Sequence, residues 1–291
     1  AEVVSSIRAM TSWNGDLWIG SFGRGGEIWL YNDDDGLRNL EPGKSFAFYG
    51  IGSGQGIGEL QPYGEYLYAT LGGSTWNDFP NNDYLHRCHI SDCDEYSDFV
   101  PLPGLPDLDP TNLFILKVFV AQGKLFLGTV NFTTGFSMVS YNENAAPGEE
   151  WDVIVDGPYS GGMFDAGNIY LWSAAVINDR IFVGTFNPST ITEIPRGTAE
   201  LWYSDDGGIN WTQYPMPLGW SLLNYGIRNI VRCDDGKFLC LLSASNMVAP
   251  DVVDIDNPLQ AGTEVWWLMN TKAASPSSET IKKKGKGRKN K

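Results

Sequence analysis

Five polar residues occupy matching positions in a phrase that recurs along the chain, and they are the first candidates for chemistry. Their side chains are mixed: two cations, one carboxylate, one hydroxyl and one amide. A glutamate can transfer protons in catalysis, and the others can hold a ligand by hydrogen bonds or charge. No catalytic residue type repeats, so the set favours ligand binding over catalysis. The five residues are Arg8, Glu59, Lys117, Ser173 and Asn229.

The recurring phrase is marked by Asn112, Asn168 and Asn224, which stand at an interval of 56 residues. Each asparagine opens an apolar run, a turn and a second apolar run. Residues 7–20 and 57–70 have the same shape. Repetition on this scale predicts a solenoid, a propeller or an array.

Each copy predicts a unit of antiparallel strands. A polar or glycine-containing turn separates the first two strands, and the third reads Gly-x-Glu-apolar-Trp in its fullest form, as at 25–29 and 262–266. Shorter fourth strands are predicted at 45–49, 98–102, 151–155 and 211–214. The second strand holds a small residue that indicates close approach of a neighbouring sheet: Gly20, Ala69, Gly128, Gly184 and Cys240.

The fold class predicted from this pattern is all-β, as a five-bladed β-propeller with four-stranded blades. Residues 1–4 are predicted to supply the last strand of the fifth blade and so close the ring. The propeller would fill residues 1–270, followed by a basic, disordered tail at 271–291. The predicted blades cover residues 5–50, 56–102, 112–157, 168–217 and 224–270.

The charge is unevenly distributed. The whole chain has a formal net charge of −15, yet residues 282–291 hold only basic and neutral side chains. An acidic body should repel nucleic acid and anionic membrane, whereas the tail could bind an acidic surface. No apolar run reaches the roughly 18 residues that a transmembrane helix needs.

The four cysteines form two close pairs, Cys88 with Cys93 and Cys233 with Cys240. This spacing predicts local disulfides and an oxidising compartment. A start at Ala1 fits a processed, secreted protein. An alternative is a zinc site built from His86, His89 and the first cysteine pair, but strand alternation turns His86 and His89 to opposite faces.

Two further groups of residues have alternative interpretations. Asp109 and Asp165 each precede a repeated asparagine by three residues, and they could either bind calcium or cap the turn. No other metal or cofactor is predicted. Aromatic residues in loops, Trp76, Tyr159 and Trp220, could form a platform for a sugar.

Two resemblances to known families extend this interpretation. Residues 204–211 (SDDGGINW) resemble the Asp-box of sialidase-like propellers, which in that family is a structural hairpin. The repeat over residues 1–270 resembles a family of bacterial and archaeal extracellular propellers, with its Asn-Gly turn, Gly-Thr strand and Gly-x-Glu-Leu-Trp strand. Both resemblances imply the propeller fold, which hosts enzymes, lectins and scaffolds alike.

The sialidase resemblance also implies a catalytic alternative. Sialidases bind the substrate carboxylate with arginines and use a tyrosine nucleophile with a glutamate partner, roles that Arg8, Arg228, Tyr225 and Glu59 could fill, with Arg232 close in sequence. Five-bladed furanosidases also resemble this fold, but they need several inward carboxylates, and the aligned positions offer only Glu59.

The sequence therefore predicts an extracellular, non-catalytic binding or assembly module at a cell surface, with a glycan or a protein as its ligand. Two alternatives stay open. One is a sialidase-like glycoside hydrolase. The other is a structural subunit whose basic tail, from Lys282, docks on an acidic neighbour.

Overall fold

The computed structural model describes nine stretches of the chain: residues 6–22, 25–46, 56–72, 85–156, 167–187, 198–216, 224–233, 238–245 and 265–269. Within these stretches the protein is all-β, with no α-helix and one 3₁₀ turn, η2 (Tyr96–Asp98). None of the described elements is a helix that could span a membrane. The closing strand predicted at 1–4 and the tail at 271–291 lie outside the described residues.

The strands form two large antiparallel sheets. The first contains β1 (Ser6–Trp13), β2 (Asp16–Phe22), β3 (Ile28–Asn32), β4 (Gly36–Asn39), β5 (Gly56–Tyr63), β6 (Tyr66–Gly72), β7 (Leu85–His89) and β8 (Val100–Pro101). The second contains β9 (Phe114–Ala121), β10 (Lys124–Val130), β11 (Ser137–Tyr141), β12 (Trp151–Asp156), β13 (Tyr170–Ile177), β14 (Arg180–Phe186), β15 (Leu201–Ser204), β16 (Thr212–Gln213), β17 (Asn224–Cys233), β18 (Phe238–Ser245) and β19 (Val265–Met269).

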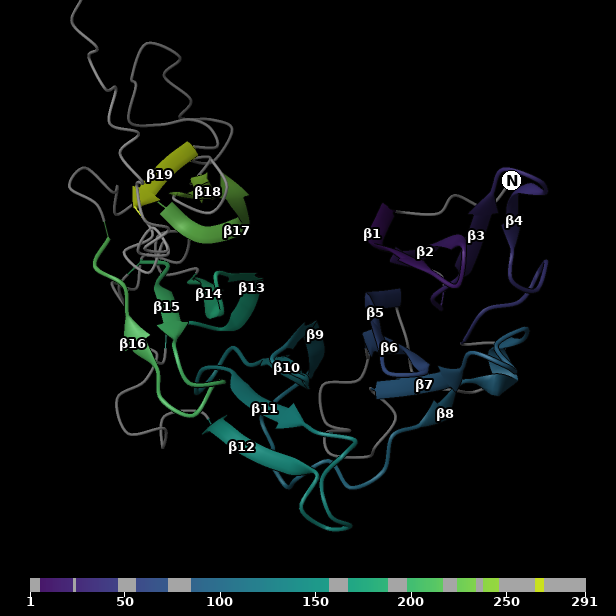
Figure 1. Ribbon diagram of the computed structural model, residues 1–291, viewed down its shortest axis with the longest axis horizontal. Helices are drawn as coiled ribbons and strands as arrows, with labels where there is room; N and C mark the ends of the chain where they lie inside the picture. Colours follow the sequence, from purple (N-terminus) through teal and green to yellow (C-terminus); the bar gives the residue numbers. More distant parts are fainter. Residues whose placement is uncertain are drawn as a thin grey trace, which may run out of the picture.

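Each sheet is a series of meanders, and we number the meanders as units one to five: β1–β4, β5–β8, β9–β12, β13–β16 and β17–β19. Figure 1 shows the units arranged around a common centre, with the first strand of each unit nearest to it. Within each sheet, consecutive units are joined at a single bridge, Phe22 with Gly56, Val130 with Tyr170 and Phe186 with Gly226.

The hairpin turns follow the sequence closely. Both central residues have positive φ in the turns Asn14-Gly15 (51° and 89°) and Gln122-Gly123 (47° and 76°), and the same holds for Asn178-Asp179 (52° and 61°). Positive φ at both positions is the backbone of a type I′ turn, whose twist matches that of the flanking strands. The predicted hairpins at these positions are therefore confirmed.

A bulge in every first strand changes the predicted alignment. The bulged residue is skipped in the pairing with the second strand, and the residue after it pairs again. In unit one the bulged residue is Arg8, so Ala9, not Arg8, matches Glu59, Lys117, Ser173 and Asn229. The five equivalent bulge residues are Arg8, Gly58, Leu116, Trp172 and Arg228.

The same register corrects the position of the small residue in the second strand. Thr70 pairs with Glu59 and Leu242 pairs with Asn229, so these two residues, not Ala69 and Cys240, match the glycines. The close approach predicted at the glycines is present. A Cβ on Gly20, Gly128 or Gly184 would lie 2.8, 2.8 or 2.6 Å from a side-chain atom of Ile57, Leu171 or Ile227 in the next unit.

The short fourth strands agree less well. In unit one the strand is β4 at Gly36–Asn39, ahead of the predicted 45–49. An Asx turn places it there, since Asn32 Oδ1 accepts the N–H groups of Asp34 and Asp35 at 3.1 and 2.7 Å. In the other units β8, β12 and β16 overlap the predicted ranges.

The first and last units each keep an apolar face exposed. Ile7 is 62% exposed, whereas its four counterparts are at most 1% exposed because each packs on the preceding unit. At the other end, Val265 is 59% exposed, whereas its counterparts Ile28, Leu85, Met138 and Leu201 are at most 3% exposed. The counterparts of Ile7 are Ile57, Ile115, Leu171 and Ile227.

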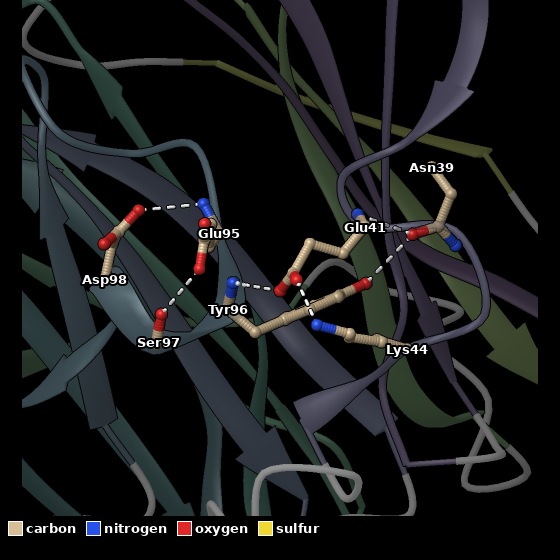
Figure 2. A network of polar contacts seen from close by, with 7 residues as sticks. All are labelled: Asn39, Glu41, Lys44, Glu95, Tyr96, Ser97 and Asp98. Carbon is tan, nitrogen blue, oxygen red and sulfur yellow. Dashed lines mark hydrogen bonds and ion pairs between the residues drawn. The ribbon is translucent and has the colours of Figure 1, made fainter.

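A polar network joins units one and two (Figure 2). Glu41 Oε2 accepts the N–H of Tyr96 at 3.0 Å, and Glu41 Oε1 pairs with Lys44 at 2.7 Å. The Tyr96 hydroxyl accepts the N–H of Ile28 at 2.7 Å and donates to Asn39 at 3.4 Å. Tyr96 is buried, so its hydroxyl satisfies backbone and side-chain groups that water does not reach.

The turn at residues 204–211 is held by local contacts of its own side chains. Ser204 Oγ accepts the N–H of Gly208 at 2.9 Å, and Asp206 Oδ1 accepts the N–H of Asn210 at 2.9 Å. Gly207 and Gly208 have φ of 78° and 85°, and Trp211 Nε1 donates to the Gly208 carbonyl at 2.9 Å. The link from this turn to the sialidase-like family stays a prediction.

Candidate central binding site

A cavity of about 510 Å³ lies where the first strands of the five units meet. Every unit contributes to its lining. The bulges position the side chains, because a bulged residue is aimed away from the regular alternation of the strand. The polar and aromatic lining residues used below are Arg8, Glu59, Lys117, Trp172, Arg228 and Asn229.

Among the described residues, the charged side chains that line the cavity are three cations and one carboxylate. Lys117 Nζ and Glu59 Oε2 lie 2.7 Å apart and form an ion pair between units three and two. Arg8 and Arg228 make no ion pair with any other residue in the described stretches; each guanidinium instead lies over a ring, Phe22 at 5.5 Å and Trp172 at 4.9 Å. The described lining is thus positively charged, although the chain as a whole is acidic.

Burial and neighbouring charges shift the pKa values of these groups. Burial lowers the pKa of Arg8. The charges of Tyr170 and Glu59 raise this pKa, and the charge of Arg228 lowers it. Burial raises the pKa of Glu59, and Lys117 opposes that shift. Burial also raises the pKa of Tyr170, although both arginines stabilise its ionised form. Arg8 is therefore coupled electrostatically to Tyr170, Glu59 and Arg228.

An aromatic cluster forms the wall beneath Arg228. Tyr170 and Phe186 stack with ring centroids 4.5 Å apart, and Trp172 meets Phe186 edge-on at 5.0 Å. Tyr225 lies behind Trp172 at 6.0 Å. Gly226 leaves room for this arrangement, because a Cβ there would collide with the Trp172 indole. The cluster presents one indole, that of Trp172, to the cavity.

The structure brings together most of the residues predicted for the site. Arg8, Glu59, Lys117 and Asn229 line the cavity, as does Arg228. Ser173 does not, because it is buried behind the lining and donates to the Ile227 carbonyl at 2.7 Å.

The other predicted residues do not contribute to the described lining. Tyr225 and Arg232, both on β17, lie outside it. Trp76, Tyr159 and Trp220 lie outside the described residues. Trp172 was missed by the sequence analysis, although Leu116, Trp172 and Arg228 stand at the same 56-residue interval as the asparagines.

The predicted metal sites have structural explanations. Asp109 Oδ1 accepts the N–H and the hydroxyl of Thr111 at 2.8 and 2.6 Å, and its Oδ2 accepts the Thr134 hydroxyl at 2.7 Å, so it caps the turn. Asp165 lies outside the described residues. Across the described stretches, no three His, Cys, Asp or Glu side chains gather as a metal site would require.

The cysteines pair as predicted, Cys88 with Cys93 and Cys233 with Cys240. The first disulfide removes both cysteines from the alternative zinc site. His86 is buried in the core, while His89 is on the surface beside Ser91. The zinc interpretation is therefore wrong.

No protein-family model matches the chain, and no curated protein does so either. Solved structures resemble it at low identity. The extracellular domain of a hybrid two-component system from B. thetaiotaomicron is 15% identical with a TM-score of 0.50, over 81% of this chain and 25% of that chain. A GH74 xyloglucanase from Xanthomonas campestris is 14% identical with a TM-score of 0.51, over 84% of this chain and 37% of that chain. The chain thus spans well under half of either neighbour, and the likeness concerns the fold.

Proposed function

We propose that this protein is an extracellular, non-catalytic carbohydrate-binding β-propeller whose ligand occupies the central cavity. The observation that carries the proposal is that the Trp172 indole lines the cavity together with the polar side chains of Arg228, Asn229, Glu59 and Lys117. Saccharides bind through the apolar face of the sugar ring against an aromatic ring and through hydroxyl groups against polar side chains. The cavity volume is in the range typical of small-ligand sites, about 300–1,000 Å³.

The proposal includes a closed ring of five blades. The five units repeat one strand order, and in the described stretches units one and five alone keep an apolar face exposed where the other units pack together. On unit one, Ile7, Ile19, Trp29 and Leu37 surround an apolar hollow of about 200 Å³. Unit five offers Val231, Val265 and Trp267. At every other junction, the face equivalent to that of unit one packs against the face equivalent to that of unit five. The repeat therefore favours packing of these two exposed faces on each other.

Two observations support an extracellular location. The chain contains two disulfides within short loops, and all four of its cysteines are used in them. Disulfides persist in oxidising compartments and are rare in the cytosol. Among the structural neighbours, one is an extracellular domain and another is a xyloglucanase.

The sialidase-like alternative is favoured by one observation and opposed by two. Arg8, Arg228 and Glu59 do line one cavity. However, Tyr225 lies outside the described lining, and Glu59 pairs with Lys117 at 2.7 Å. Most glycoside hydrolases use two carboxylates, and the described lining holds one. Binding is therefore the better account of this geometry.

A glycan array probed with the full chain tests the proposal, together with the variant Trp172→Ala. We expect binding to a subset of glycans and at least a tenfold loss of affinity in W172A, because ring stacking is lost. Phe132→Ala is the matched control, since Phe132 is an exposed aromatic residue outside the cavity. Equal binding by W172A and the parent, or release of sugar from the array glycans, would contradict the proposal.

A further inference from the structure

Arg8 and Arg228 are equivalent residues on units one and five. We call the space between the exposed faces of these two units the open junction. Both occupy the bulge of a first strand, Arg8 on β1 of unit one and Arg228 on β17 of unit five. Figure 1 shows these two strands on opposite sides of the opening between the first and last units. Both side chains reach the same cavity. The junction that must close is therefore flanked by one arginine on each side.

The two guanidinium groups oppose the closure that the apolar faces favour. Neither makes an ion pair within the described stretches. Burial lowers the pKa of Arg8, the charges of Tyr170 and Glu59 raise it, and the charge of Arg228 lowers it. Like charges in a partly buried space repel with little screening. Lys117 cannot relieve this repulsion, and Glu59 is already engaged by Lys117. A bound anion between the two guanidinium groups would offset their repulsion.

We propose that a carboxylate of a bound acidic saccharide, a hexuronate, bridges Arg8 and Arg228 and thereby closes unit one onto unit five. The inference rests on the proposed function and gives it a substrate class. A carboxylate has two acceptor oxygens, and each can accept a charge-assisted hydrogen bond from a different guanidinium. The sugar ring then lies against Trp172.

Closure linked to binding follows from this arrangement. A ligand that touches both sides of a junction binds the closed state more tightly than the open state, so it shifts the population toward closure. In the closed state the exposed side chains of both faces become buried. Leu37 on unit one and Trp267 on unit five report this, because they are 60% and 67% exposed and neither lines the central cavity.

The experiment measures binding and closure separately on the full chain. Binding of tetragalacturonate and of its methyl ester, which lacks the charge, is followed by calorimetry. Hydroxyl-radical footprinting then reports Leu37 and Trp267, with Phe132, 51% exposed and outside the junction, as the internal reference. We expect the acid to bind at least tenfold more tightly than the ester and to protect Leu37 and Trp267 at least threefold, with Phe132 unchanged.

Variants assign the effect to the two arginines. Arg8→Gln and Arg228→Gln should each remove the preference for the acid over the ester and abolish the protection of Trp267. Arg38→Gln is the matched control, because Arg38 is an exposed arginine of unit one outside the cavity. R38Q should behave as the parent chain does.

The outcomes separate this inference from the proposed function. Equal affinity for acid and ester overturns the carboxylate bridge and leaves a neutral-sugar site standing. Tighter binding of the acid without protection of Trp267 overturns the closure step alone. Protection that grows with protein concentration, with a dimer in sedimentation, shows that a second copy covers the faces. Absence of binding to both probes, together with a blank glycan array, overturns both proposals.

Discussion

Lys117 Nζ lies 2.7 Å from Glu59 Oε2, so β9 of unit three is tied to β5 of unit two by an ion pair at the cavity wall. Both side chains are about four-fifths buried, at 22% and 20% exposure. A buried pair contributes little when intact, but removal of one partner leaves the other charge without compensation. The pair therefore sets the ionisation of the described lining's single carboxylate.

Lys117→Met is expected to destabilise the fold by about 1–3 kcal/mol near neutral pH. Burial already raises the pKa of Glu59, and loss of Lys117 removes the interaction that opposes this shift. The folded-state pKa then lies further above the unfolded value than in the parent, so stability is full at acid pH and falls more as the pH rises through the folded-state pKa. Urea unfolding between about pH 4 and pH 8 measures this slope. The double variant Glu59→Gln/Lys117→Met should lack it, and a parent-like profile in K117M would refute the prediction.

Arg180 and Lys124 occupy equivalent positions at the start of β14 and β10, yet their ion pairs should contribute differently to the stability of the fold. Arg180 is buried and forms a fork with Asp205, with two hydrogen bonds of 2.8 Å, and its guanidinium lies 4.2 Å from the Tyr203 ring centroid. Lys124 pairs with the exposed Asp152. We expect Arg180→Lys to cost about 1–3 kcal/mol and Lys124→Ala under about 1 kcal/mol. Equal losses of thermal stability would show that the fork adds nothing.

His86 should make the protein sensitive to acid. Burial lowers its pKa to about 4, and its Nδ1 has no hydrogen-bond partner among the residues that the structure describes. Because the unfolded chain binds the proton more readily, the stability held above about pH 6.5 is lost as the pH falls toward 4, by up to about 3 kcal/mol. His86→Leu should flatten this part of the profile, measured by thermal unfolding at each pH. His89→Gln alters the other histidine of the chain and should leave the slope in place; a slope that persists in H86L would rule His86 out.

The sequence predicted those parts of the fold that short-range chemistry decides. Asn14-Gly15 forms the expected turn because both residues tolerate positive φ, and Ser204 and Asp206 hold their turn through adjacent amides. The predicted fourth strand of unit one was misplaced, although the Asn32 turn ahead of β4 was a signal of the same local kind.

The candidate site was harder to predict because it depends on bulges and on packing between units. The sequence alignment matched Arg8 to Glu59, whereas the strand register matches Arg8 to Gly58, and it left out the bulge residue Trp172. The interval from Trp172 to Arg228 could have indicated the bulge position. Whether the faces of units one and five are exposed or buried depends on packing between units that are distant in sequence. Short sequence patterns do not predict such packing.

Gly128 and Gly184 test how tightly neighbouring units pack, because they are equivalent glycines with different neighbours. A Cβ on Gly184 would lie 2.6 Å from Ile227 Cβ, which the backbone of β17 holds in place. A Cβ on Gly128 would meet Leu171 Cδ1 at 2.8 Å, the end of a side chain that can rotate away. We therefore expect Gly184→Ala to cost about 1–3 kcal/mol and Gly128→Ala about 1 kcal/mol or less, measured by urea unfolding. Since the Gly184 contact lies between units four and five, G184A should also displace β17 and weaken the proposed glycan binding at Arg228. Equal effects of the two substitutions on stability and binding would contradict this prediction, because both junctions would then accommodate the added methyl group equally well.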